Sequence, residues 1–473
     1  HYDKGSRITE ITDKLGQTTG FEYDPHGNII TVKDRTGLKT NLEYDANDNL
    51  VRVADPMGGI TNYAYDNMDN LTSFTDAAGK TTEYTYDLEG NLTSRKTPAG
   101  NTEKFGYDEK GRLTSHISPS GKKVSYDYDK LNDLLEKSYE DAKGKETDPK
   151  VTYTYNKFGE RISMKDGTGK SRYEYDALGR IIKAINGSGK ETCYVYDGAD
   201  NLQEIIYPDG KKTGYEYDLN DNLIKVTDKN GSVTEYDYDA LGRVTAAVRP
   251  NQTKTTVKYD AEDHITKITN TCTSCGKEIS SYAYTYNAQG YIVSEAASEL
   301  EAGTRKEPSY EDWYNWGGKK LTEDTSCCHE EKTVITKRTY KYDDNWELTR
   351  CTEKVEGGRK TVHNYTYDAV GNRTLYEKIE DGFTKEKYKY EYSDSNQMTR
   401  RINCMIWGDR GVRYQYDGDG NLIKTTENSY DTPTQYEYTA ENRLAVVRQG
   451  ENVLMAALCD GDGNRVFQID NTY

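Results

Sequence analysis

The dipeptide Tyr-Asp recurs along this chain at a spacing of 21 residues, and no other feature of the sequence limits the fold as strongly. The spacing holds from Tyr2 to Tyr128 and again from Tyr175 to Tyr259. After Tyr286 the period loosens, and a decayed copy that begins at Cys459 ends the series. Such regularity is typical of a repeat architecture, in which each unit packs against its neighbours.

Residues 80–100, with the sequence KTTEYTYDLEGNLTSRKTPAG, show how one repeat folds. Side chains alternate between two faces over residues 82–86, which predicts a strand. Residues 87–91 predict a tight turn, because Asp accepts downstream backbone N–H groups and Gly or Asn tolerates a positive φ. Residues 92–96 are the predicted return strand, and residues 97–100 form a second turn around a Pro and a Gly.

The two turns of each repeat join every strand to the next, so the chain is predicted to be one long antiparallel meander. Two strands per repeat, at a spacing of ~4.8 Å, widen the sheet by ~10 Å per repeat. A sheet of about twenty repeats must coil, because strands twist. The predicted fold class is all-β, with tandem β-hairpin repeats coiled into a hollow spiral shell or tube.

Tyrosine is predicted to build the interior of this sheet. Only 34% of the residues are hydrophobic, below the usual ~45–50%, but 43 are Tyr. Tyr is apolar along most of its length and favours strands. Pairs such as Tyr84 and Tyr86 lie two residues apart and therefore share one face. We expect neighbouring hairpins to stack these rings into ladders, although the alternation does not say which face they occupy.

The charge of the chain excludes several partners. The net charge is -17 and is spread along the sequence, whereas nucleic-acid binding needs clustered Lys and Arg. No apolar run approaches the ~20 residues of a transmembrane helix, so we expect no membrane insertion. His1 already lies within a repeat, which suggests a piece of a longer protein.

The regularity of the repeat predicts three parts of one array. Residues 1–290 form a regular array, residues 291–322 an irregular insertion within it, and residues 323–473 looser repeats that continue the same sheet. The insertion contains Trp313 and Trp316, which we interpret as a patch that packs over the sheet, with a sugar-binding shelf as the alternative.

The repeat resembles that of the YD-repeat, or Rhs, family, and the resemblance covers nearly the whole chain. The family's unit reads roughly Tyr-x-Tyr-Asp-x-x-Gly-Asn/Arg-Leu. Matching segments begin at Tyr86-Asp87, Tyr107-Asp108, Tyr175-Asp176, Tyr238-Asp239 and Tyr367-Asp368. The family includes Rhs proteins, the B and C components of Tc toxins, wall-associated bacterial proteins and teneurins.

The resemblance implies a non-enzymatic shell of β-hairpins in a larger secreted or surface-exposed bacterial protein. The shell would enclose or present another domain, with the chain's own flanking or C-terminal domain as cargo. Near the C-terminus this sequence has no Asp-Pro-x-Gly motif with a following Tyr-rich segment, the element that closes the toxin-bearing forms. The alternatives are a self-assembling extracellular fibre or tube, in which copies join as a homo-oligomer or filament, and a carbohydrate-binding adhesin whose partners are glycans.

No catalytic residue is predicted. About twenty Tyr-Asp copies argue for turn capping, since a catalytic pair is needed only once. A calcium site at Asp417 and Asp419, or at Asp460 and Asp462, is an alternative to the same turn role. Neither segment has the Glu at position twelve of an EF-hand loop.

The cysteines are predicted to gather in two insertions at turn tips. Cys272 and Cys275 lie in one long repeat, and Cys327, Cys328 and His329 lie in another. These residues could hold zinc, since C-x-x-C is a usual half-site. The extracellular character of the resembled family favours disulfides instead, and free thiols are the third alternative.

Overall fold

The computed structural model describes residues 1–300, 332–406, 410–428 and 431–471. These residues form one antiparallel sheet of 39 strands and contain no helix. Each strand pairs with the strands that precede and follow it in the chain, from β1 through to β39, as the predicted meander requires. The sheet is unclosed. No helix of the described segments is long and apolar enough to cross a membrane.

The strands of residues 1–252, which we call the first coil, are mostly five or six residues long. They are β1 (Glu10–Thr12), β2 (Thr18–Tyr23), β3 (Ile29–Lys33), β4 (Lys39–Tyr44), β5 (Leu50–Ala54), β6 (Ile60–Tyr65), β7 (Leu71–Thr75), β8 (Thr81–Tyr86), β9 (Leu92–Lys96), β10 (Thr102–Tyr107), β11 (Leu113–Ile117), β12 (Lys123–Tyr128), β13 (Leu134–Glu140), β14 (Val151–Tyr155), β15 (Arg161–Asp166), β16 (Gly169–Tyr175), β17 (Ile181–Ile185), β18 (Glu191–Tyr196), β19 (Leu202–Ile206), β20 (Lys212–Tyr217), β21 (Leu223–Thr227), β22 (Val233–Tyr238) and β23 (Val244–Val248).

The strands of residues 253–471, the second coil, are longer at its start. They are β24 (Thr253–Tyr259), β25 (Ile265–Cys272), β26 (Glu278–Tyr286), β27 (Ile292–Leu300), β28 (Thr333–Tyr342), β29 (Leu348–Val355), β30 (Lys360–Tyr367), β31 (Arg373–Glu380), β32 (Phe383–Tyr392), β33 (Met398–Asn403), β34 (Gly411–Tyr416), β35 (Leu422–Thr426), β36 (Thr434–Tyr438), β37 (Leu444–Gln449), β38 (Asn452–Cys459) and β39 (Arg465–Asp470).

The predicted repeat determines where the strands end. Even-numbered strands from β2 to β36 end on a Tyr, and β38 ends on the Cys of the decayed copy. Asp follows this Tyr in most repeats, and Asn, Ser or Thr takes its place after Tyr155, Tyr286, Tyr392 and Tyr438. The turn that follows, here called the YD turn, has Gly90 at a φ of 83° in the repeat analysed above. The register shifts by one residue at the Tyr, so that Tyr86 pairs with Leu92. Odd-numbered strands lead into the second turn of the repeat.

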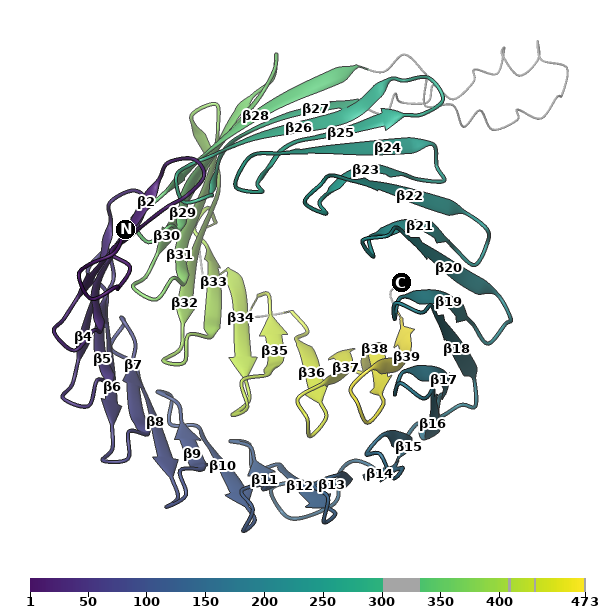
Figure 1. The fold of residues 1–473 in the computed structure, drawn as a ribbon. Coiled ribbons are helices and arrows are strands. Elements are labelled where there is room, and N and C mark those ends of the chain that lie inside the picture. The colour runs from purple at the N-terminus through teal and green to yellow at the C-terminus, as the bar shows by residue number, and fades with distance from the viewer. Residues whose placement is uncertain (301–331, 407–409, 429–430, 472–473) are drawn as a thin grey trace, which may run out of the picture.

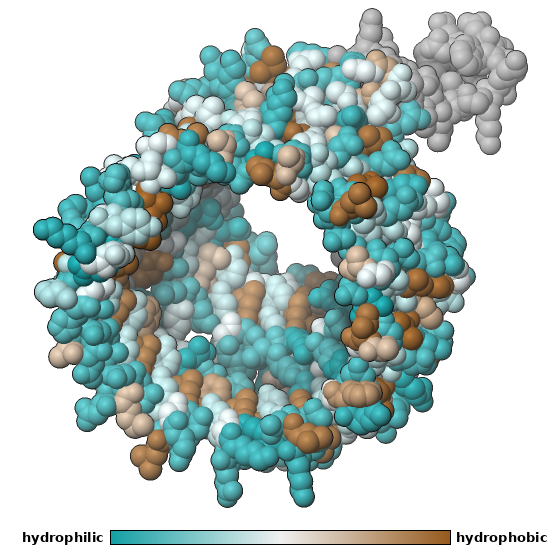
Figure 2. Space-filling view, viewed as in Figure 1, coloured by the Kyte–Doolittle hydropathy of each residue, from teal (hydrophilic) through white to brown (hydrophobic). Residues whose placement is uncertain are grey.

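The sheet winds into a spiral of more than one full turn (Figure 1). The first coil runs around the circumference, and β33–β39 then pass along the inner side of β8–β16 (Figure 1). An open mouth leads into a hollow interior (Figure 2). The predicted coiled hairpin array is therefore confirmed as a hollow spiral.

The two faces of the sheet differ in chemistry. One carries the Tyr pairs and their cross-strand partners, such as Tyr63 opposite Phe74. The other carries ion pairs such as Lys96 with Glu83, whose Nζ and Oε2 lie 3.0 Å apart. The second coil contacts the aromatic face of β13–β15, and it lies on the inner side of these strands (Figure 1). The aromatic face is therefore the inner face there.

A cluster of buried apolar residues lies where the second coil covers the first. Val124, Tyr139, Val151, Tyr153 and Met164 pack there against Ala440. Met164 is 1% exposed and Tyr139 is 3% exposed. Elsewhere most Tyr are half-buried, because only one coil shields them.

The predicted division into three parts remains a prediction. At the start of the predicted insertion, residues 292–300 form β27, which pairs with β26 and β28. The rest of the insertion, with Trp313 and Trp316, lies outside the described residues. Residues 333–470 continue the same sheet wherever they are described.

Candidate functional site

In most repeats the tyrosine just before the YD turn fastens its hairpin to the preceding one. Tyr86 donates its hydroxyl hydrogen to the carbonyl oxygen of Leu71, at 3.0 Å, and Leu71 begins the previous return strand. This explains why the position takes Tyr instead of Phe, since the ring covers the neighbour and the hydroxyl satisfies a backbone carbonyl. The same bond is made by Tyr23, Tyr65, Tyr128, Tyr155, Tyr175, Tyr196, Tyr217, Tyr238, Tyr259, Tyr286, Tyr342, Tyr367, Tyr392, Tyr416 and Tyr438.

The aspartate caps the YD turn, as predicted. In the repeat at Asp87, Oδ1 accepts the backbone N–H groups of Glu89 and Asn91 at 3.1 and 2.8 Å. Oδ2 accepts the side-chain amide of Asn91 at 3.0 Å. Hydrogen bonds from Asn91 lower the pKa of Asp87, although partial burial opposes the effect. The carboxylate is thus a saturated acceptor, which suits a turn and not proton transfer.

In some repeats the fourth residue after the Asp is Arg instead of Asn. The longer Arg side chain caps its own turn and also reaches the next repeat. Arg112 Nε binds Asp108 Oδ2 at 2.7 Å, and its NH1 donates to the carbonyl of Asp129 at 2.8 Å. Its guanidinium lies 4.9 Å from the ring centre of Tyr128. Arg180 and Arg243 repeat this arrangement on Tyr196 and Tyr259.

The predicted Tyr ladders occur only in part. Among the described residues, Tyr376 stacks on Tyr388 at 6.3 Å and lies 5.5 Å from Tyr365, all in β30–β32. In the first coil the described ring contacts are instead Tyr63 with Phe74 and Phe105 with His116. Most of the Tyr that end the even-numbered strands there are held by their hydroxyl bonds, because successive repeats lie two strands apart.

The second coil docks on the first along a continuous seam, which is the candidate functional site. YD turns of the second coil meet second turns of the first coil, and the paired residues are roughly 250 to 320 positions apart in the sequence. The seam closes the wall between the two coils. Its links fall into three stretches.

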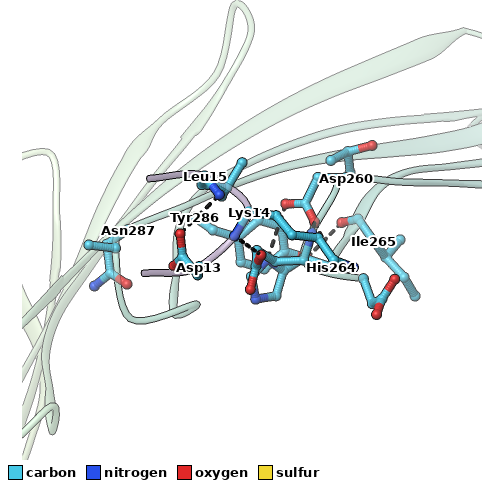
Figure 3. Close-up of polar contacts among 12 residues, drawn as sticks. Asp13, Lys14, Leu15, Asp260, His264, Ile265, Tyr286 and Asn287 are labelled. Carbon is cyan, nitrogen blue, oxygen red and sulfur yellow. Dashed lines mark hydrogen bonds and ion pairs between the residues drawn. The ribbon is translucent and has the colours of Figure 1, made fainter. Parts of the chain in front are cut away.

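At its start, the YD turn after β24 meets the turn after β1 (Figure 3). The backbone N–H of Lys14 donates to Glu262 Oε1 at 2.9 Å. Arg35 NH1 lies 3.1 Å from Asp13 Oδ2 and its NH2 lies 3.9 Å from Glu262 Oε2. His264 stacks on Tyr286 beneath this contact, with ring centres 4.6 Å apart.

The middle of the seam contains an acidic cavity of about 400 Å³. Asp55 of the first coil accepts the amide of Asn345 at 3.2 Å. Asp343, Glu347 and Asp368 of the second coil line the same cavity. Burial raises the pKa of Glu347, and the negative charges of Asp343, Asp368 and Asp55 raise it further. Glu347 stands where most repeats have Asn or Arg.

At the end of the seam, buried polar groups join the coils. Asp419 accepts the backbone N–H and the hydroxyl of Ser120 at 2.8 and 2.6 Å. Lys137, with a side chain 10% exposed, binds Glu441 Oε1 at 2.8 Å and the carbonyl of Gly461 at 3.0 Å.

The last link across the seam is a bidentate ion pair between Arg161 and Asp462. Arg161 NH1 and NH2 bind the two carboxylate oxygens of Asp462 at 2.7 and 2.6 Å. Hydrogen bonding to Asp462 raises the pKa of Arg161 above its ordinary value. Asp166 Oδ2 accepts the N–H of Gly461 at 2.6 Å. Paired donors and acceptors of this kind are strong and directional.

The four aspartates considered for calcium divide between turns and seam. Asp417 and Asp460 cap their own YD turns. Asp419 and Asp462 reach across the seam to Ser120 and Arg161. In the described residues no group of three or more His, Cys, Asp or Glu side chains is placed to hold a metal ion. Calcium binding remains a prediction.

The cysteine prediction also stays open. Cys272 ends β25 and is 1% exposed, and its Sγ lies 2.9 Å from the hydroxyl of Ser274. Cys275 is exposed on the turn that follows. Cys327, Cys328 and His329 lie outside the described residues, so disulfides, zinc and thiols remain the alternatives.

Sequence reasoning did not predict the seam, although it singled out Asp419 and Asp462 for a different role. One signal was available, since the residue after the YD-turn Asp or its substitute is small or acidic in the second coil. These residues are Ala261, Ala288, Asp344, Ala369, Asp394, Gly418, Ala440 and Gly461.

Two family patterns match the first part of the chain. The Teneurin YD-shell family matches residues 1–147 and 132–228, and the RHS repeat matches residues 217–254 and 238–271. The chain is 30% identical over 302 residues to the tRNA3(Ser)-specific nuclease WapA of Bacillus spizizenii. It is 28% identical over 300 residues to the tRNA nuclease WapA of Bacillus subtilis. Each match covers 61% of this chain and 12% of the relative.

Solved structures share the fold over nearly the whole chain. The Photorhabdus luminescens Tc holotoxin pore with a mutated TccC3 matches with a TM-score of 0.72 at 16% identity, over 97% of this chain and 26% of that one. The TcdB2-TccC3-Cdc42 structure matches with a TM-score of 0.72 at 15% identity, over 99% and 27%. At these identities the likeness is one of fold.

Proposed function

Because this chain is a YD-repeat protein of the Rhs and teneurin-shell type, we propose that it is a structural shell segment of a larger secreted or surface-exposed bacterial protein. The shell encloses or presents another domain of that protein. The observation that carries the proposal is the seam, which joins successive coils into a continuous wall around a hollow (Figure 2). An open ribbon with no such links would enclose nothing.

The chemistry of the repeat supports a role without catalysis. The YD-turn aspartates are occupied by turn N–H groups, and the Tyr hydroxyls are occupied by backbone carbonyls. Any activity would belong to the enclosed or attached domain. The curated relatives named as tRNA nucleases make a toxic enzyme a reasonable cargo class. This chain spans only 12% of those relatives, so their activity is not assigned to it.

Electron microscopy of the purified chain at several concentrations tests the shell. Hollow particles of one size, with the second coil seated inside the first, are the expected result. Long tubes of constant width would overturn the shell in favour of a filament. The filament is the second candidate because β39 is exposed along its whole length and pairs with β38 alone among the described strands.

Enclosure is tested with a small reporter domain fused after Tyr473. The reporter should resist a protease while the seam is intact. A matched fusion with Asp462→Ala removes the cross-coil link to Arg161 and leaves the contacts of Arg161 with Tyr153 and Tyr173 in place. Equal cleavage in both fusions, at the rate of the free reporter, would argue against enclosure.

A further inference from the structure

Each coil has two edges, one formed by its YD turns and the other by its second turns. The YD turns of the two coils have different surroundings. In the seam, YD turns of the second coil face second turns of the first coil. The YD turns of the first coil therefore line the opposite edge, away from the seam. We call the nine of these turns between β6 and β23 the apolar rim.

The apolar rim presents large hydrophobic side chains at the tips of its turns. They are Met68 at 59% exposure, Leu88 at 86%, Leu131 at 77%, Phe158 at 74%, Leu178 at 71%, Leu219 at 104% and Leu241 at 68%. Hydrophobic side chains are visible at intervals around the mouth (Figure 2). Single exposed apolar residues need no explanation, but this set occupies equivalent tips in seven of nine consecutive turns.

Turns that dock in the seam have the opposite composition. Their first tip residue is small where packing is tightest: a Cβ at Gly461 would lie 2.5 Å from Val151 Cγ1, and one at Gly418 would lie 3.2 Å from the backbone of Pro119. Their second tip residue is usually polar and makes the cross-coil bond, as Glu262 and Asp419 do.

This contrast makes a further coil a poor fit to the apolar rim. Leu88 and Leu219 stand at the first tip position, where six of the eight seam turns have Gly or Ala and the other two have Asp. Leu131, Phe158 and Leu178 stand at the second, where the seam needs a hydrogen-bonding group. A surface that buries these side chains must itself be apolar, because a polar group buried there would lose its hydrogen bonds to water.

We propose that the apolar rim is a self-association surface, at which two copies of this chain meet rim to rim about a two-fold axis. A two-fold interface brings the same patch of both copies together, so apolar tips meet apolar tips. Two tip residues from each of nine turns give eighteen residues per copy. This is close to the roughly 20–30 residues per side of a stable interface.

The remaining tips are compatible with this pairing. Glu89 and Glu109 are acidic, whereas Lys110, Lys130 and Lys157 are basic, so the rim offers both signs to its copy. Rim-to-rim pairing covers the mouth of each spiral with the other. The result is a closed pair of chambers and not a tube, because a two-fold contact uses up the rims of both copies.

Light scattering on the full chain after size exclusion tests the proposal. The parent should have twice the 53.8 kDa mass of one chain. The variant Leu131→Ser, Leu178→Ser, Leu219→Ser should return to the single-chain mass. Phe383→Ser is the matched control, because Phe383 is 72% exposed on a second turn of the second coil. It should leave the dimer intact.

Crosslinking of the parent chain makes the test independent of the variants. When labelled and unlabelled copies are mixed, crosslinks should form between Lys110, Lys130 or Lys157 of one copy and the same set of lysines in the other copy. A single-chain mass at every concentration would overturn the proposal, as would a dimer that survives the triple substitution or filaments of indefinite length. None of these results affects the shell function unless the particles also lack a hollow.

Discussion

Two pairs of facing residues show what the second coil adds to the repeat. Tyr153 faces Met164 in β14 and β15, and Tyr215 faces Val226 in β20 and β21. Both Tyr occupy the same place in their repeats. The first pair lies under the second coil, with Tyr153 at 6% and Met164 at 1% exposure. The second pair is half-buried, because no second coil covers it.

The comparison separates two sources of stability. Hydroxyl bonds and capped turns hold hairpins to their neighbours in both regions, so strand geometry does not depend on a buried core. Within the described residues, the buried apolar cluster lies where coil covers coil, whereas Ala246 and Val362 are buried outside it. Repeat arrays behave as sums of unit and neighbour terms, and the seam adds a contact between units far apart in the chain.

Met164→Ala is expected to give the largest effect. Removing this fully buried side chain leaves a cavity against Val151 and Gly461, with a loss of about 2–5 kcal/mol in unfolding free energy. Urea unfolding measures the loss. Hydrogen exchange should quicken in residues 439–464 as well as in β14 and β15, because the seam loosens.

The matched control uses one substitution in both regions. Val124 is 4% exposed under the second coil, whereas Val226 is half-buried on the uncovered wall. Val124→Ala removes two buried carbon groups, for about 1.6 kcal/mol or more. Val226→Ala should cost less and leave exchange in residues 439–464 unchanged. Equal losses would mean that the second coil does not bury this region in solution.

Replacing the Tyr hydroxyl should have a smaller effect that is the same in both regions. Tyr155→Phe removes the bond to Leu134, and Tyr217→Phe removes the bond to Leu202. Each should lower unfolding free energy by about 1 kcal/mol, since the ring remains and only one hydrogen bond is lost. A loss at Tyr155 several times larger than at Tyr217 would show that the hydroxyl bond depends on the seam.

The sequence predicts the repeat well because its contacts are local. The alternation around Tyr84, the cap at Asp87 and the turn at Gly90 each follow from residues within one hairpin. The hydroxyl acceptor lies one repeat away and is still periodic. Strand ends and the antiparallel order could therefore be predicted before any coordinates.

The seam could not be predicted in the same way. Ser120 and Asp419 are 299 residues apart, and their meeting depends on the curvature accumulated over many strands. A small change of twist per strand would pair Asp419 with a different turn. The inner position of the Tyr face depends on the same curvature, since alternation defines two faces but not the direction of bending.

A substitution in the acidic cavity should have the smallest effect on the unfolding free energy, and it should raise this energy instead of lowering it. The reason is that docking of the second coil brings several carboxylates together in this cavity. Glu347→Gln should raise unfolding free energy at neutral pH by about 0.5 kcal/mol, through an amide that can donate to Asp343. Asn372→Asp is the converse control: Asn372 donates to Asp368 Oδ2 at 3.0 Å, and a carboxylate there should destabilise the same cavity.

The pH dependence of Glu347→Gln identifies the cause. Burial and three nearby carboxylates raise the pKa of Glu347 in the folded chain above 4.5. The fold therefore binds the proton more tightly than the unfolded chain, and this stabilising contribution is complete below pH 4.5 and lost as the pH rises through the folded pKa. The advantage of Gln should thus be present at pH 7 and shrink toward pH 4 in paired urea titrations. An advantage that stays constant across this range would place its origin in packing, and the seam would then contain no electrostatic opposition to docking.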